Sequence, residues 1–302
     1  MLSQLLYNHP DLRLPVLKGL KLLVESNLAV ASEDNSSTDL EAGHLTIRGS
    51  ATPEEAAQNV TFLKSQVESW FAVFFNIFGS VDRDCRGVAG DVIGVWANLA
   101  ESQDVSKACL TVVGLFKQHL QKVTNAPNDQ QNATVAATMQ DLLILLLPFL
   151  ETPDITSLFR LCLSEEVLSC KDNGIQKRGY KLLAKSISSG KLQVDVLDTL
   201  RTLDSFVTGL SPAAKKDRFV LLSSLVPGIP LTSMHIIPSL IPEAVLGTKE
   251  PSEKARMAAF DLVVTMGRKM CEGGTVKRQM LDEMDSNDTG EGSWSLFRNV
   301  GS

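Results

Sequence analysis

This sequence of 302 residues has few aromatic side chains and no long uninterrupted run of apolar residues. Aromatic residues make up 6% of the chain, and its most apolar runs, at 70–78 and 142–147, are far shorter than the roughly 18 residues that a membrane helix needs. No alternation of polar and apolar residues of any length predicts a β-strand. The 44% of hydrophobic residues therefore favour a core of stacked helices.

Residues that carry enzyme chemistry are scattered. The four histidines stand alone and the five cysteines form no Cys-x-x-Cys motif, so the sequence spells out neither a zinc site nor a Cys/His nucleophile. The cysteines lie mostly in apolar helical patterns, which is typical of buried thiols in a reducing compartment. Gly87, Gly90 and Gly94 have helical spacing and form no phosphate-binding loop. We expect no enzyme activity, cofactor, metal site or small-molecule substrate.

A helical pattern returns about every forty residues in the second half of the sequence. Four leucines share this spacing: Leu142, Leu182, Leu222 and Leu262. Bulky apolar residues precede the last three by two positions: Tyr180, Val220 and Phe260. Each copy has small or apolar residues at i, i+3, i+4 and i+7, as in an amphipathic helix. We therefore predict an all-α, HEAT/armadillo-like α-solenoid of antiparallel helix pairs.

Polar connectors separate the predicted helices. Thr52, Pro53 and Glu55 form the pattern of a capped helix start, for a helix that runs to about residue 78. Five aromatic residues surround much of that helix, which is either packed on both sides or exposes an aromatic patch: Trp70, Phe71, Phe74, Phe75 and Phe78. The other predicted helices cover residues 11–29, 84–99, 106–124, 133–150, 154–163, 174–188, 193–208, 212–226, 232–246 and 251–271.

Composition divides the chain into four segments. We predict a helical repeat segment at 1–29, a disordered loop or insertion at 30–51, one HEAT-repeat solenoid at 52–272, and a flexible acidic tail or linker at 273–302. A solenoid normally finishes on a polar capping repeat, and none is evident in the sequence. We therefore expect a fragment of a longer chain.

Charge is unevenly distributed. Residues 1–169 hold 11 Lys and Arg against 20 Asp and Glu, whereas residues 170–280 hold 17 against 10. Basic residues gather in three successive repeats: Lys177, Arg178, Lys181, Lys185, Lys215, Lys216, Arg218, Lys254 and Arg256. Stacking would align them in a basic stripe that binds RNA phosphates or an acidic peptide. Two alternatives are solvated charges, or a polar ladder between repeats formed by Gln176, Lys216 and Arg256.

Several packing motifs in this sequence resemble the ribosomal RNA-processing protein twelve family, whose members are large eukaryotic HEAT-repeat proteins of the nucleolus. These motifs lie at residues 14–24, 176–183, 240–250, 253–256 and 259–263. The likeness extends from residue 11 to about residue 275. Because the motifs serve helix packing, no catalytic residue carries over from the family.

The resemblance implies a non-enzymatic scaffold in ribosome biogenesis, acting in pre-ribosomal RNA processing, pre-ribosome maturation and nuclear export. The implied partners are the pre-ribosomal particle, ribosomal RNA and assembly factors, with a Ran-type GTPase or export factors as further candidates and no membrane. The implied location is the nucleolus and nucleus, with shuttling to the cytoplasm as an extension. Two other classes share the architecture: a karyopherin-type nuclear transport receptor and a scaffold subunit of a phosphatase or kinase.

Overall fold

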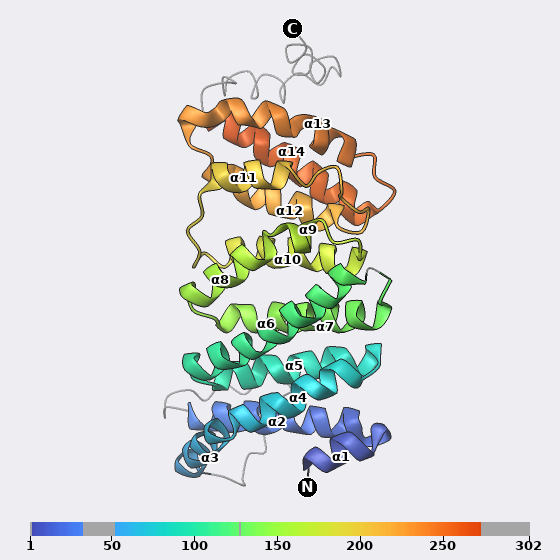
Figure 1. Cartoon of the computed structure of the whole chain (residues 1–302). Coiled ribbons are helices and arrows are strands. Elements are labelled where there is room, and N and C mark those ends of the chain that lie inside the picture. Colours follow the sequence, from blue (N-terminus) through green and yellow to red (C-terminus); the bar gives the residue numbers. More distant parts are fainter. Residues whose placement is uncertain (1, 33–51, 127, 273–302) are drawn as a thin grey trace. The chain divides into compact units, whose positions relative to one another are not determined.

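The computed structural model describes residues 2–32, 52–126 and 128–272, and every regular element within these ranges is helical. Contacts divide the chain into two compact units, Met1–Leu158 and Phe159–Ser302, and each has two layers of helices (Figure 1). The predicted all-α fold of paired helices is confirmed. The predicted solenoid at 52–272 includes parts of both units. Residues 30 and 31, the first of the predicted disordered loop, are helical, so the predicted start of the loop is too early. Residues 33–51 of that loop and the predicted tail lie outside the described residues.

One layer of the first unit consists of three long helices that pack in order: α2 (Arg13–Ala31), α5 (Arg83–Leu99) and α7 (Gln130–Leu146). Each is covered by a helix of the second layer, respectively α3 (Pro53–Ser65), α4 (Val67–Ser80) and α6 (Ser102–Asn125). The shorter elements are α1 (Leu2–Asn8), η1 (Pro10–Leu12) and η2 (Leu147–Phe149). The helix α8 (Thr152–Cys162) contains the boundary between the units.

The second unit repeats this arrangement. Its first layer consists of α10 (Asn173–Ser188), α12 (Lys215–Leu225) and α14 (Glu253–Glu272), each packed on the next. The covering layer consists of α9 (Glu165–Leu168) on α10, α11 (Val196–Asp204) on α12, and α13 (Ile237–Gly247) on α14. Two short 3₁₀ helices, η3 (Val226–Gly228) and η4 (Leu231–Ile236), join α12 to α13.

The leucine ladder lies in the core. Leu142, Leu182, Leu222 and Leu262 are each at most 1% exposed, and they belong to α7, α10, α12 and α14, the second helix of each pair. This confirms the repeat assignment. The apolar residues two positions earlier differ from one another, because Tyr180 is fully buried whereas Val220 and Phe260 are 37% and 50% exposed. The repeat therefore sets the inner face of each helix, while its flanks depend on the neighbouring elements.

Polar side chains cap the first turn of several helices, as the sequence predicts for the helix that starts after Thr52. The hydroxyl of Thr52 accepts a hydrogen bond from the backbone N–H of Glu55 at 3.2 Å, and the carboxylate of Glu55 accepts one from the N–H of Thr52 at 2.8 Å. Aspartate carboxylates accept the equivalent backbone bond at the starts of α5, α7, α10 and α11: Asp82, Asp129, Asp172 and Asp195. Each such cap is worth about 0.5–2 kcal/mol.

The single helix predicted from residue 52 to about residue 78 is interrupted, and this prediction is wrong. The helix α3 ends at Ser65 and α4 begins at Val67, with Gln66 between them. The two helices pack on different partners, α2 and α5, and the interruption lets each turn its own apolar side inward. No glycine or proline stands at the junction, so local sequence contains no signal for it.

The aromatic residues of α4 pack inside the first unit. Phe71, Phe74 and Phe78 are buried, and the rings of Trp70 and Phe74 stack with centroids 5.4 Å apart. The ring of Trp96 from α5 meets the Phe74 ring edge-on at 5.5 Å. The structure therefore agrees with a packed helix, and not with an exposed aromatic patch.

Among the described residues, one helical stretch, Gln130–Phe149, is long and apolar enough to cross a membrane. This stretch comprises α7 and η2, and half of it is buried inside the protein. The helix α7 packs extensively on α6 and also contacts α5. Its apolar composition is thus accounted for by its place in the core.

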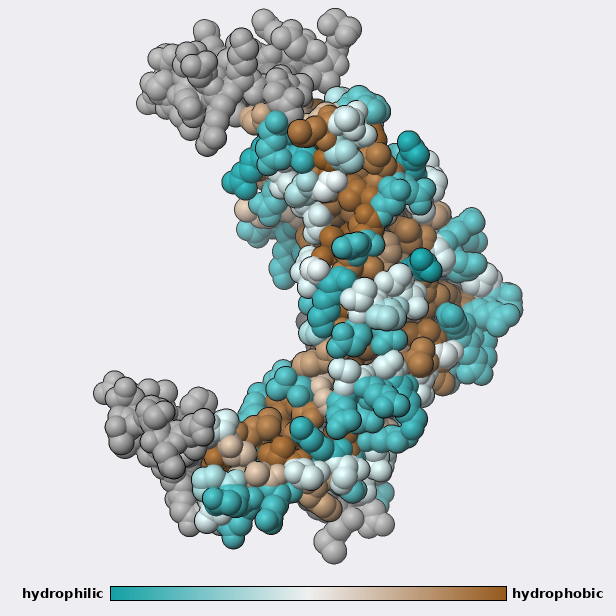
Figure 2. All heavy atoms as spheres, turned by 90° about the vertical axis from the view of Figure 1, so that its left-hand side faces the viewer, coloured by the Kyte–Doolittle hydropathy of each residue, from teal (hydrophilic) through white to brown (hydrophobic). Residues whose placement is uncertain are grey.

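Apolar side chains also reach the surface. Figure 2 looks along the helices and shows brown, apolar atoms between teal, polar ones in both units. In the second unit, the large apolar residues that are at least half exposed are Leu231, Leu246, Met257, Phe260 and Val264. Three of these belong to α14, so this helix has an apolar stripe on its exposed side.

Replacing Leu222 or Leu262 by alanine should lower the free energy of unfolding by about 2–5 kcal/mol, because the cavity left in a packed interior cannot close fully. Urea unfolding followed by circular dichroism measures this loss. The matched control is Leu246→Ala, since Leu246 is 67% exposed and its truncation should change stability by less than about 0.5 kcal/mol. Equal effects at Leu222 and Leu246 would contradict the repeat assignment.

Candidate nucleic-acid interface

The helix α10 has four basic residues and no acidic residue. Its N-cap is Asp172, whose carboxylate accepts a hydrogen bond from the N–H of Ile175 at 2.9 Å. Its inner face is apolar or small and includes Ile175, Gly179 and Leu183. The basic residues occupy the opposite face, so folding concentrates their charge on one side of the helix.

Three lysines form the outer face of α10. Lys177 and Lys185 are exposed and Lys181 is half-buried. Their spacing of four residues places them about 6 Å apart along the helix axis. Within the described part of the chain, none of the three has an ion-pair partner. Arg178 is turned along the helix, with Nη1 donating to the carbonyl of Gly174 at 3.1 Å. The lysine face is therefore an uncompensated positive surface that favours an anionic ligand.

The lysine positions of α10 are not basic in the next repeat. The spacing that equates Leu182 with Leu222 equates Lys177 with Asp217, Lys181 with Leu221 and Lys185 with Leu225. All three counterparts are buried in α12, between α10 and α14. The predicted stripe therefore does not continue from α10 onto α12 at equivalent positions.

Three other residues of the predicted stripe, Lys215, Lys216 and Arg256, bond to nearby groups of the second unit. Lys215 forms an ion pair with Glu250, and the Nζ atom of Lys216 lies 3.5 Å from the Oδ1 atom of Asp217. Arg256 donates from Nη1 to the carbonyl oxygens of Glu250 and Pro251, both at 2.9 Å. Lys254 is exposed at the start of α14. Lys215, Lys216 and Arg256 therefore bond to groups of the protein itself, so the predicted stripe has fewer basic groups available to bind RNA.

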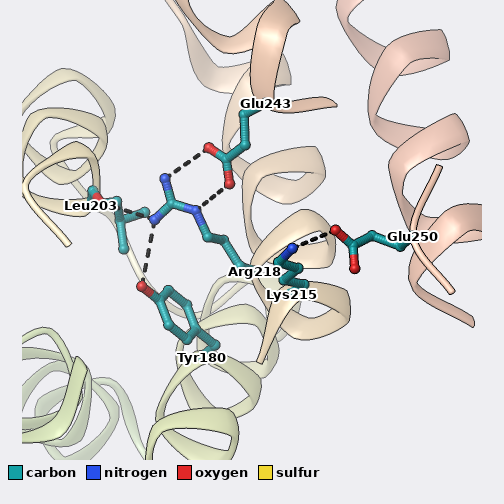
Figure 3. Close-up of polar contacts among 6 residues, drawn as sticks. All are labelled: Tyr180, Leu203, Lys215, Arg218, Glu243 and Glu250. Atoms are coloured by element: carbon teal, nitrogen blue, oxygen red, sulfur yellow. Dashed lines mark hydrogen bonds and ion pairs between the residues drawn. The ribbon is translucent and has the colours of Figure 1, made fainter. Parts of the chain in front are cut away.

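Arg218 is not a surface residue, and its prediction as an RNA contact is wrong. Its side chain is 1% exposed, between the two layers of the second unit (Figure 3). Its Nε and Nη2 atoms donate to the two carboxylate oxygens of Glu243 at 2.6 and 2.9 Å. Its Nη1 atom donates to the carbonyl of Leu203 at 2.8 Å and lies 3.5 Å from the hydroxyl of Tyr180. Arg218 thus connects α10, α11, α12 and α13.

The charge of Arg218 is stabilised inside the protein by its partner. Burial alone lowers the pKa of a guanidinium, but the hydrogen bonds and negative charge of Glu243, together with the contact to Tyr180, outweigh burial and raise the pKa of Arg218 above its ordinary value. The fork of two parallel bonds is the strongest geometry for an arginine and a carboxylate. Arg218 is therefore charged at neutral pH, and it acts as a structural clamp.

The sequence does contain a signal for the burial of Arg218. Leu221, Leu222 and Leu225 are buried and follow it at i+3, i+4 and i+7, which places Arg218 on the same inner face of α12. A basic residue in such a pattern needs an acidic partner. Glu243 occupies that role from α13, and its identity depends on the packing of a different repeat.

Of the three residues of the predicted polar ladder, Gln176 bonds to groups outside its own helix pair. Its side chain is buried and donates from Nε2 to the carbonyls of Leu168 and Gly209, both at 2.8 Å. Its Oε1 atom accepts from the N–H of Ser211 at 2.8 Å, which ties α10 to the connection between α11 and α12. Lys216 and Arg256, by contrast, bond within their own repeats. A ladder of all three residues is therefore not formed.

The described residues contain no group of three or more His, Cys, Asp or Glu side chains placed to hold a metal ion. Burial, joined at Cys109 by the negative charge of Asp154, raises the pKa of the Cys109 and Cys162 thiols to about 12. These two thiols are protonated at neutral pH, which is the state of inert core cysteines.

Replacing Arg218 by methionine should lower the free energy of unfolding by about 3–5 kcal/mol, because it leaves the carboxylate of Glu243 without its cation. Denaturant unfolding measures the loss, and Arg268→Met on the exposed side of α14 is the control. The double variant Arg218→Met, Glu243→Leu should recover much of the stability, since replacing both members of a buried pair is often neutral. If the single variant is as stable as the control, Arg218 does not clamp these helices.

The amino-acid sequence is also similar to those of known proteins. Residues 1–81 match the sequence model of a family described as ribosomal RNA-processing protein 12, HEAT repeats. The chain is 28% identical over 283 residues to ribosomal RNA-processing protein 12 of Saccharomyces cerevisiae, a match that covers 91% of the chain and 22% of the relative.

Two further relatives agree. A putative ribosomal RNA-processing protein 12 of Schizosaccharomyces pombe is 28% identical over 279 residues, which is 89% of the chain and 23% of that protein. An RRP12-like protein of Homo sapiens is 30% identical over 147 residues, which is 47% of the chain and 11% of that protein. The chain thus spans less than a quarter of the length of these relatives. The resemblance to the ribosomal RNA-processing protein 12 family is therefore confirmed along about nine-tenths of the chain.

Proposed function

We propose that this chain is part of a non-enzymatic HEAT-repeat scaffold in ribosome biogenesis, and that the lysine face of α10 contacts ribosomal RNA. The observation that carries the proposal is the set of Lys177, Lys181 and Lys185, which lie on one helix face without a carboxylate partner among the described residues. The relatives' names, which refer to ribosomal RNA processing, support the choice of RNA as the anion.

The chemistry of lysine defines what this face would recognise. An ammonium group is a point charge that binds phosphate oxygens and does not read the edge of a base. Structured RNA presents phosphates at its backbone and is recognised mostly by shape. The lysine face would therefore hold an RNA segment in position with little sequence preference, which suits a scaffold.

The rest of the proposed role follows from the family. The scaffold would act in pre-ribosomal RNA processing, pre-ribosome maturation and nuclear export, with the pre-ribosomal particle and assembly factors as partners. It would be located in the nucleolus and nucleus and would shuttle to the cytoplasm with its cargo. A Ran-type GTPase or an export factor would be a further partner in that export step. Stacked helical repeats supply extended surfaces for several partners at once, and such a role needs no catalytic group.

Changing Lys177, Lys181 and Lys185 together to glutamine should weaken binding to a structured ribosomal RNA fragment. Three phosphate contacts account for roughly a 40-fold fall in affinity between about 50 and about 200 mM salt, because each contact releases condensed counterions. The variant should lose this part of the salt dependence. The slope of the logarithm of affinity against the logarithm of salt concentration should therefore become shallower by about two to three. Fluorescence anisotropy with labelled RNA over a salt series measures both the affinity and the slope.

The control replaces three exposed lysines of the first unit, Lys18, Lys64 and Lys117, by glutamine. This control removes the same net charge, so it separates a local surface from a general effect of charge. Thermal melting should be unchanged in both variants, because exposed substitutions alter stability by under about 0.5 kcal/mol each. If both variants bind RNA with the same affinity and slope, α10 is not the RNA surface.

A further inference from the structure

An open groove lies between α12 and α14, on a different part of the second unit from the lysine face of α10. It has a volume of about 440 Å³ and is lined mainly by Lys216 and Val220 of α12 and by Glu253, Lys254, Met257 and Asp261 of α14. No residue of α10 lines it. Its volume is within the range of ligand sites, but its open shape suits a segment of protein more than an enclosed small molecule.

The floor of the groove is apolar and extends beyond it. Val220 and Met257 are 37% and 55% exposed, and both line the groove. Phe260 and Val264, each 50% exposed, follow Met257 at i+3 and i+7, so they lie on the same face of α14. The exposed stripe is therefore continuous along about two turns of α14.

This apolar exposure is not a general property of the repeat. Tyr180 has the repeat position of Val220 and Phe260, and it is fully buried. Arg218 and Leu203 of the following repeat lie around Tyr180, with the guanidinium of Arg218 5.9 Å from its ring (Figure 3). The helices α12 and α14 keep large apolar side chains in the same position without such a cover.

The rim of the groove has charges of both signs. Lys254 supplies a positive group, and Glu253 and Asp261 supply two negative ones. Lys216 also lines the rim, but its Nζ atom lies 3.5 Å from the Oδ1 atom of Asp217. The carboxylates would repel an RNA backbone, which distinguishes the groove from α10. Charges of both signs around an apolar floor are complementary to a segment that has apolar residues flanked by both signs of charge. Such a segment is a feature of proteins and not of nucleic acids.

We propose that the groove between α12 and α14 binds an amphipathic helix of a partner protein. Large apolar side chains of that helix pack on Val220 and Met257. An acidic residue of that helix faces Lys254, and a basic residue faces Asp261. This is the mode in which an amphipathic helix lays its apolar face into a groove and its charges select the orientation. The proposal does not depend on the RNA role, because the two surfaces share no residue.

The test uses a display library of random peptides long enough for about four helical turns. Peptides are selected on the full chain and counter-selected on the variant Val220→Ser, Met257→Ser. We expect enriched peptides with apolar residues at i, i+3 or i+4 and i+7, flanked by acidic and basic residues. Each should bind the double variant at least about tenfold more weakly, as expected when central apolar anchors are lost. Thermal melting checks that the variant is folded.

Two controls make the result specific. The variant Leu231→Ser, Leu246→Ser removes exposed apolar side chains outside the groove and should bind the selected peptides like the wild type. The variant Lys254→Glu should bind them more weakly, and changing an acidic residue of the peptide to lysine should restore binding to this variant. Restoration identifies the direct charge pair, which a general loss of structure would not produce.

Several outcomes would overturn the proposal. One is a selection that enriches no peptide with the expected pattern, and another is a set of peptides that bind the groove variant as tightly as the wild type. Competition by the ribosomal RNA fragment at the groove would show that its occupant is a nucleic acid. Sedimentation that shows a dimer of the wild type and a monomer of the Val220→Ser, Met257→Ser variant would show that the occupant is a second copy of the chain.

Discussion

In each helix pair of the second unit, the second helix is buried between its neighbours. The rest of this unit depends on that constraint. The helix α12 packs on α10, α11 and α14 at once, and it shows how far this burial extends. Leu221, Leu222 and Leu225 fill its interior faces, and Asp217 and Arg218 are buried with them. A buried guanidinium needs a partner, and Glu243 from α13 provides it. The repeat packing therefore produces the polar clamp as a consequence.

The same packing determines which charges remain available to other molecules. On α10, the inner face takes the apolar residues and leaves three lysines outside without an acidic partner among the described residues. Little of α12 is exposed to solvent, and the Nζ atom of Lys216 lies close to the carboxylate of Asp217. The helix α14 has charged residues of both signs and an exposed apolar stripe. A positive surface and a mixed apolar groove thus stand on neighbouring helices of one unit, and different classes of ligand suit them.

Much of the fold could be predicted because the relevant forces act over short distances in the sequence. The capping box of Thr52 and Glu55 involves residues three apart, and the periodic leucines mark the inner face of each helix. The interruption at Gln66 could not be predicted, because α3 and α4 turn toward different partners and no local residue encodes that change. The candidate site was predicted only in part, since helical spacing identifies the lysines of α10 but does not show which other basic residues are bonded within the unit.

The sequence by itself determined the helical class, the period of about forty residues, the buried leucines and the family resemblance, because all four are patterns of residue type along the chain. The tertiary structure decided the fate of residues whose environment comes from other repeats. It buried Arg218 against Glu243, paired Lys215 with Glu250, and left Val220 exposed at a position where Tyr180 is covered. The physical reason is that burial and charge pairing depend on the three-dimensional neighbours of a side chain, which lie 25 to 38 residues away for the contacts of Arg218 with Glu243 and Tyr180.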